Sequence, residues 1–178
     1  MSFLIKGLIR LRFLLTSKEK AYDRIHSVLS VYKDLIIRLN GDEGRRCYRV
    51  PAMRGVDEDM REWSIYMILE HNVIVNRTMT AIVDSLARNE EPLNLPVKDS
   101  KKDVMPSGNP GPEQIEAFVA SVEDHLRVVK QLKRLRGTLR KRHPIFGMLD
   151  AHGWHCMFCL HLEVHLPQIE SVLDGLKN

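Results

Sequence analysis

The stretch DAHGWHCMFCLHLEVHLPQIESVLDGL, residues 150–176, decides the fold that the sequence predicts. At 100° per residue its apolar side chains fall on one side of a single helix, and His161 and His165 lie within that stripe. Residues four apart on a helix are neighbours, so both imidazoles can reach one metal ion at about 2.0–2.1 Å. A pair of hydrogen-bonded core histidines is the alternative, because each unmet buried polar group costs about 1–3 kcal/mol.

Three earlier segments show the three-and-four spacing of apolar residues that is typical of helices. They run from Thr16 to Asn40, with Gly41 as a stop, from about Asp59 to Arg88, and from about Pro112 to Arg140. The fourth helix begins near Asp150, and no strand pattern is found between the helices. The sequence therefore predicts an all-α fold, a four-helix bundle.

The proline-rich segment 89–112 connects the second and third predicted helices. It is far longer than the 2–8 residues usual between bundle helices, so we expect a long crossover from one end of the bundle to the other. A segment of this kind can also roof a pocket.

A third histidine, His71, lies at the centre of the apolar face of the second helix. A lone histidine there is usually a hydrogen-bonded core residue, but side-by-side packing would let it approach His161 and His165. His125, on the flank of the third helix, is expected at the rim, with a fourth ligand or a residue that orients a ligand as the alternatives. The sequence thus offers His71, His161 and His165 as metal ligands.

A rival cluster lies on the opposite side of the last helix and contains His152, His155, Cys156 and Cys159. Structural zinc sites usually draw ligands from two elements, and Cys47 is the only other cysteine. The same face continues into Glu163 and Glu170, which predicts that it points towards water. We therefore do not expect a metal there.

Composition indicates one globular domain, since 44% of the 178 residues are apolar and 28% are charged. Three cysteines suit a reducing cytosol, so we expect a cytoplasmic protein. The net charge of +4 permits an acidic partner, but the basic run between residues 130 and 142 has no stacking aromatic residues, and no nucleic-acid partner is expected.

The first 15 residues form an amphipathic segment that precedes the bundle domain of residues 16–178. Charged residues interrupt its apolar run, so stable membrane insertion is not expected, although surface attachment is an alternative. We expect this segment to pack on the domain or on a second subunit, in a homodimer.

Three short motifs, taken in order, resemble the DinB/YfiT-like superfamily of metal-dependent enzymes. They are LEH at Leu69–His71, HPIFG at His143–Gly147 and HLEVHLPQI at His161–Ile169, and the resemblance spans roughly residues 17–175. It implies a four-helix bundle with one crossover and a divalent metal ion, commonly zinc or nickel, on His71, His161 and His165 with open positions. Characterised relatives include transferases and isomerases that use bacillithiol, mycothiol or glutathione.

The resulting hypothesis is a metal-dependent thiol transferase or hydrolase that acts on a small-molecule substrate, with a low-molecular-weight thiol as a possible co-substrate. The alternative is a non-catalytic metal-binding or dimerising bundle with a structural or vestigial site. Pro167 departs from a regular helix two residues after His165, and a kink there would move that ligand. Glu70 and Glu163 adjoin the ligands in sequence but point away from them on their helices.

Overall fold

A computed structural model describes residues 3–37, 39, 42–92 and 101–177. In these residues the chain is mostly helical, which confirms the all-α prediction at this level. The α-helices are α1 (Phe3–Leu15), α2 (Lys18–Ile36), α3 (Ile65–Ala87), α4 (Glu113–Gln131) and α5 (Ala151–Leu176). Three short 3-10 helices, η1 (Glu43–Arg45), η2 (Glu58–Met60) and η3 (Lys101–Val104), lie between them. The strands β1 (Lys141–His143) and β2 (Gly147–Leu149) form a hairpin.

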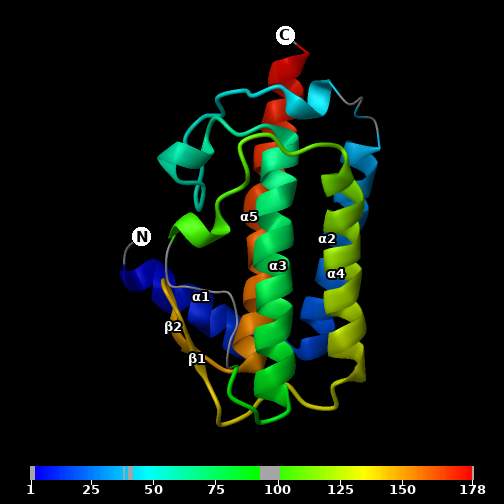
Figure 1. Cartoon of the computed structure of the whole chain (residues 1–178). Helices are drawn as coiled ribbons and strands as arrows, with labels where there is room; N and C mark the ends of the chain where they lie inside the picture. Colours follow the sequence, from blue (N-terminus) through cyan, green and yellow to red (C-terminus); the bar gives the residue numbers. More distant parts are fainter. Residues whose placement is uncertain (1–2, 38, 40–41, 93–100, 178) are drawn as a thin grey trace.

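Four helices, α2 to α5, lie side by side (Figure 1). Both α3 and α2 pack against α4 and α5, so that each long helix has two long neighbours. In Figure 1, α3 and α4 run in one direction and α2 and α5 in the other, so the segment after α3 returns along the full length of the helices. Residues 93–100 of this predicted crossover lie outside the described residues.

Polar side chains begin three of the long helices. Ser17 accepts from the backbone N–H of Lys20 at the start of α2, and Asp150 accepts from that of Gly153 at the start of α5. Ser64 caps α3, which therefore begins at Ile65 rather than at the predicted Asp59. A separate single turn, η2, covers Glu58–Met60. The predicted stop at Gly41, with Asn40, lies outside the described residues.

The third predicted helix is too long. It ends at Gln131 instead of Arg140, although the apolar spacing continues through buried Leu132 and Leu135. The carbonyls of these two leucines accept from the Lys18 ammonium and from the backbone N–H of His152, so partners outside the helix satisfy them. The chain leaves the helix and covers the end of the bundle.

The hairpin is a second correction, because no strand was predicted. His143 pairs with Gly147 across its turn, and Gly147 has φ of 72°, a conformation that glycine adopts readily. The Nδ1 atom of His143 accepts from the backbone N–H groups of Ile145 and Phe146. The HPIFG motif is thus a hairpin turn held by its own histidine, and three-residue strands are too short to show an alternating pattern.

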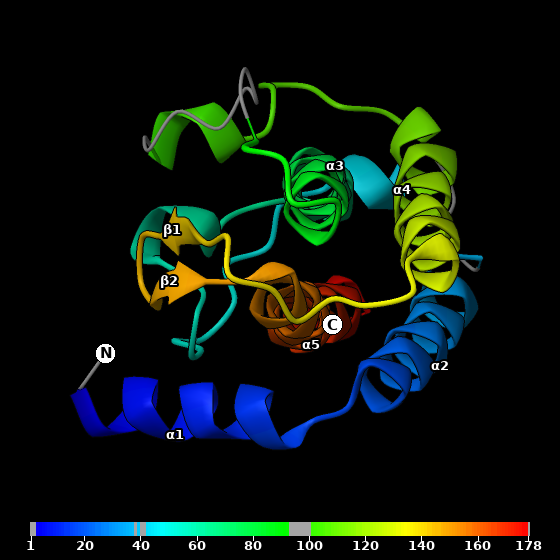
Figure 2. The ribbon, with the colours of Figure 1, turned by 90° about the horizontal axis from the view of Figure 1, so that it is seen from below.

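The helix α1 packs beside α5 and the hairpin (Figures 1 and 2). Its anchor is Phe13, which is buried and lies edge-on to Phe146 at a centroid distance of 6.0 Å. Within the described residues, no helix combines the length and the apolar composition that crossing a bilayer requires.

Candidate metal centre

The three predicted ligands meet between α3 and α5. One ring nitrogen from each of His71, His161 and His165 lies within 4.8 Å of the others. The two Nε2 atoms of His71 and His161 are 3.2 Å apart, close to the edge of about 3.3 Å expected for a tetrahedron with bonds of about 2.0–2.1 Å. These three histidines are therefore near enough to one another to hold one metal ion.

Hydrogen bonds to the far side of two rings fix which nitrogen faces the centre. The Nδ1–H of His71 donates to the carbonyl oxygen of Val104 at 2.7 Å. The Nδ1–H of His165 donates to the Oε1 atom of Gln168 at 2.8 Å, and Gln168 in turn donates to the Met60 carbonyl oxygen. Both rings therefore keep a lone pair on Nε2, which is how most metal-binding histidines are oriented.

The third ring has no such support. The Nδ1 atom of His161 is buried and lacks a hydrogen-bond partner, whichever tautomer the ring adopts. An unpaired buried nitrogen costs about 1–3 kcal/mol. Among the described residues, no protein group therefore fixes the orientation of the His161 ring from its Nδ1 side.

Burial keeps all three rings neutral, the state that binds metal ions. It lowers the pKa of His71, and it lowers the pKa of His165 to about 3. For His161, burial and the two neighbouring imidazoles lower the pKa well below its usual value. At neutral pH the centre therefore presents three uncharged nitrogen donors.

These donors fit a divalent ion of the zinc or nickel type, because imidazole suits both metals. Among the described residues, no carboxylate or thiolate joins the group. A set of three ligands leaves a coordination position for another molecule, in contrast to a closed structural site with four.

The expected disturbance by Pro167 is absent from the centre. The helix α5 is continuous from Ala151 to Leu176 with Pro167 inside it, and His165 stays beside His71 at a ring-centroid distance of 4.9 Å.

Three contributors to the centre were missed by the sequence analysis. Trp63 packs on the His71 ring at 5.2 Å, Val104 comes from η3 in the crossover, and Gln168 lies one turn after His165. Only Gln168 had a usable signal, since residues three apart on a helix are neighbours. The described part of the crossover touches the site at one point, where Val104 contacts His71.

Two carboxylates that adjoin ligands in sequence bond elsewhere. Glu70 accepts from the backbone N–H and the hydroxyl of Ser107, which ties the crossover to α3. Glu163 forms ion pairs with Arg12 and Arg24. Neither carboxylate is hydrogen-bonded to His71, His161 or His165, so these contacts do not support a role in orienting the metal ligands.

The rival cluster is buried, so the prediction that its face points towards water was wrong. The reason is the packing of α1 and α2: His152 contacts the Phe13 carbonyl oxygen, and His155 contacts that of Lys18. Burial raises the pKa of both Cys156 and Cys159 to about 12, so without a metal ion they are thiols at neutral pH.

His125 was expected at the rim and is instead completely buried. Its Nε2 atom lies 2.9 Å from Nδ1 of His155, and its Nδ1 atom lies 3.0 Å from the Thr80 hydroxyl. The chain of contacts ends on the carbonyl oxygens of Lys18 and Asn76. Four contacts share only three protons when both rings are neutral, so one of the four contacts has no proton.

Pockets lie away from the three imidazoles. One is at the start of α2, a second lies between α1, α2 and α5, and a third is beside η2. None of these three is lined by His71, His161 or His165.

Replacing Gln168 with alanine is expected to weaken zinc binding by about 10–100-fold, the usual effect of removing a group that orients a ligand. The reason is that the His165 ring loses its acceptor and can rotate. Competition titration with a zinc-binding dye measures the change. Gln131→Ala, at an exposed position on α4, is the matched control, and equal affinity of both variants would contradict the assigned role of Gln168.

Comparisons of the chain with protein-family models, with curated proteins and with solved structures find no match.

Proposed function

We propose that this protein is a divalent-metal-dependent enzyme with a DinB-like four-helix bundle, and that it acts on a small molecule as a thiol transferase or hydrolase. The single observation that carries the proposal is the convergence of three neutral imidazoles from two distant segments on one point. A divalent ion bound there would lower the pKa of a coordinated water or thiol and polarise a substrate oxygen.

The chain's own residues have separate roles in this proposal. His71, His161 and His165 hold the ion, while Val104 and Gln168 orient two of the rings. The crossover helps to exclude water, because η3 lies against the His71 side of the centre. His161 is the only one of the three that is not fully buried, so a substrate would approach the centre from its side.

A second candidate function is a metal-binding bundle without catalysis. It is favoured by the burial of His71 and His165, which are 3% and 2% exposed. In this case the ion would stabilise the packing of α3 against α5, as structural metal ions do.

The test starts from purified protein that has been stripped with a chelator and then reloaded with zinc or nickel. One ion per chain is expected, together with metal-dependent consumption of a small thiol such as glutathione in the presence of an epoxide. In that reaction the thiol sulfur attacks the epoxide carbon, the C–O bond breaks and the released oxygen takes the proton. Hydrolysis of an activated ester tests the alternative reaction class.

His165→Asn is the variant for comparison, and His26→Asn, at an exposed position on α2, is its control. Turnover in the wild type and in the control, without turnover in His165→Asn, supports the enzyme. One bound ion without turnover, and with unfolding after metal removal, supports the structural role. Failure to bind either metal would overturn both.

A further inference from the structure

The helix α1 has two different faces. Phe13 is buried on the face that packs against the domain. The opposite face carries a row of leucines at spacings of four, three and four, and it has large exposed fractions: Leu4 79%, Leu8 66%, Leu11 50% and Leu15 78%. Leu14, beside this row, is also largely exposed. We call these five leucines the leucine stripe.

The leucine stripe faces outward. Figure 2 shows α1 along one edge of the molecule, and no other helix or strand of the described residues lies beyond it. A continuous row of exposed leucines is unusual on the surface of a monomeric protein. It indicates a surface that contacts another protein or a membrane.

The charges beside the stripe are positive. The charged residues of α1 are Lys6, Arg10 and Arg12, and the helix contains no acidic residue. Arg12 also pairs with Glu163, so its charge is partly neutralised.

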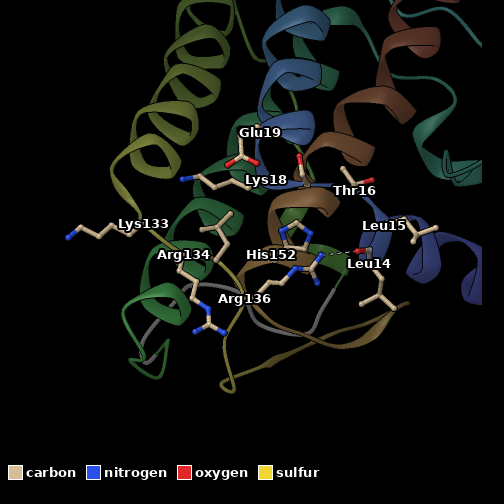
Figure 3. Close-up of a pocket in the computed structure, with 11 residues that line it drawn as sticks. Leu14, Leu15, Thr16, Lys18, Glu19, Lys133, Arg134, Arg136 and His152 are labelled. Carbon is tan, nitrogen blue, oxygen red and sulfur yellow. Dashed lines mark hydrogen bonds between the residues drawn. The ribbon is translucent and has the colours of Figure 1, made fainter.

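A second group of cations adjoins the end of the stripe. The pocket at the start of α2 has a volume of about 490 Å³ and is lined by Lys18, Lys133, Arg134 and Arg136, with Glu19 as its only acidic residue (Figure 3). We call these four residues the basic pocket. Leu14 and Leu15 line it as well, so the stripe and the pocket are one continuous surface.

Two backbone contacts hold cations of the basic pocket in place. Arg136 donates to the carbonyl oxygen of Leu14 at 2.8 Å, and Lys18 donates to that of Leu132. Both carbonyl contacts are uncharged, so the positive charges are positioned without being neutralised. Lys133 and Arg134 are exposed beside them.

We propose that this surface binds the headgroup layer of an anionic lipid membrane. The leucine stripe would enter the boundary between headgroups and acyl chains, and the basic pocket would bind lipid phosphates. A second copy of the chain fits less well, because α1 carries cations and no acidic residue, so a two-fold contact between two α1 helices offers no opposite charge. The charge of the surface therefore favours an anionic partner.

Sedimentation with vesicles tests this proposal on the full chain. We expect binding to vesicles of phosphatidylcholine mixed with phosphatidylglycerol, weak binding to phosphatidylcholine alone, and weaker binding as salt is raised. The double variant Leu8→Gln and Leu11→Gln should bind at least about tenfold more weakly, since the apolar contact is lost. Its matched control is Ile37→Gln, which is 81% exposed at the C-terminal end of α2.

The basic pocket has its own pair of variants. Lys133→Gln with Arg134→Gln should reduce binding to the anionic vesicles by about 30-fold, as two contacts of about 1 kcal/mol each predict. Arg46→Gln with Arg54→Gln removes the same charge from exposed positions before α3 and should have little effect. Circular dichroism and zinc content check that each variant is folded.

Two results would overturn the proposal. One is equal binding of all variants to both kinds of vesicle. The other is a dimer, seen by light scattering without lipid, that the Leu8→Gln and Leu11→Gln variant loses, because a second copy would then cover the stripe.

Discussion

The variant His161→Ala is expected to lose more than about 100-fold in zinc affinity, which exceeds the usual effect of removing an orienting group. The lost ring supplies one of only three nitrogen donors, and its Nε2 atom lies 3.2 Å from that of His71. Isothermal titration of the chelator-treated protein with zinc measures the affinity. Titration of His26→Ala, an exposed histidine on α2, provides the control.

The same variant should have little effect on stability without metal. The free energy of unfolding in chelator is expected to change by less than about 1 kcal/mol, because two effects oppose each other. The variant loses the packing contacts of the ring, which lowers stability, and it also removes the unpaired Nδ1 atom, which raises stability by about 1–3 kcal/mol. With zinc at about 1,000 times the wild-type dissociation constant, the wild type gains about 4.1 kcal/mol and the variant gains far less.

Urea unfolding with and without zinc separates these effects. A variant that binds zinc as tightly as the wild type would show that His161 is not a ligand. A variant that is strongly destabilised in chelator would show that the ring is there for packing.

The convergence of the three histidines was predictable because it depends on helix periodicity. His71 and His161 each fall on an apolar stripe, and both stripes must be buried, so packing of two helices brings the rings together. What supports the rings was less accessible, since Val104 reaches His71 from a segment 33 residues later in the chain. Every residue has a backbone carbonyl group, so the residue types in an irregular connection do not show which carbonyl will contact the histidine.

The buried rival cluster shows why an acidic neighbour misled the sequence analysis. The carboxylate of Glu163 suggested that this face of α5 is exposed to water. In the structure it forms ion pairs with Arg12 of α1 and Arg24 of α2, and these two helices cover the face. Docking of α1 is a long-range event that depends on Phe13 meeting Phe146. Periodicity within one helix does not contain this information.

Acidification is expected to unfold the metal-free protein at a mildly acidic pH, because several histidines are buried in their neutral form. Burial lowers the pKa of His143 to about 4, and it also lowers the pKa of His125 and His155. In the unfolded chain a histidine has a pKa of about 6.5. The unfolded state therefore binds more protons between these values, and stability falls as the pH decreases from about 6.5 to 4.

The contribution of His143 alone is large. A difference between about 6.5 and about 4, at about 1.36 kcal/mol per pH unit, corresponds to about 3 kcal/mol. Whole domains are stable by only about 5–15 kcal/mol, so this one group matters. Above pH 6.5 both states are neutral, and the stability no longer depends on this residue.

The contacts of His143 in the hairpin favour its neutral form, and they suggest a variant that tests the prediction. Its Nδ1 atom accepts two backbone N–H groups, from Ile145 and Phe146, and an imidazolium has no lone pair with which to accept them. In His143→Asn an amide oxygen can accept the same groups but does not titrate, so urea unfolding in chelator should show a weaker loss of stability between pH 6.5 and 4. His26→Asn, at an exposed position on α2, is the control variant. An identical pH dependence in His143→Asn and in the wild type would mean that protonation of the hairpin histidine does not limit folding in acid.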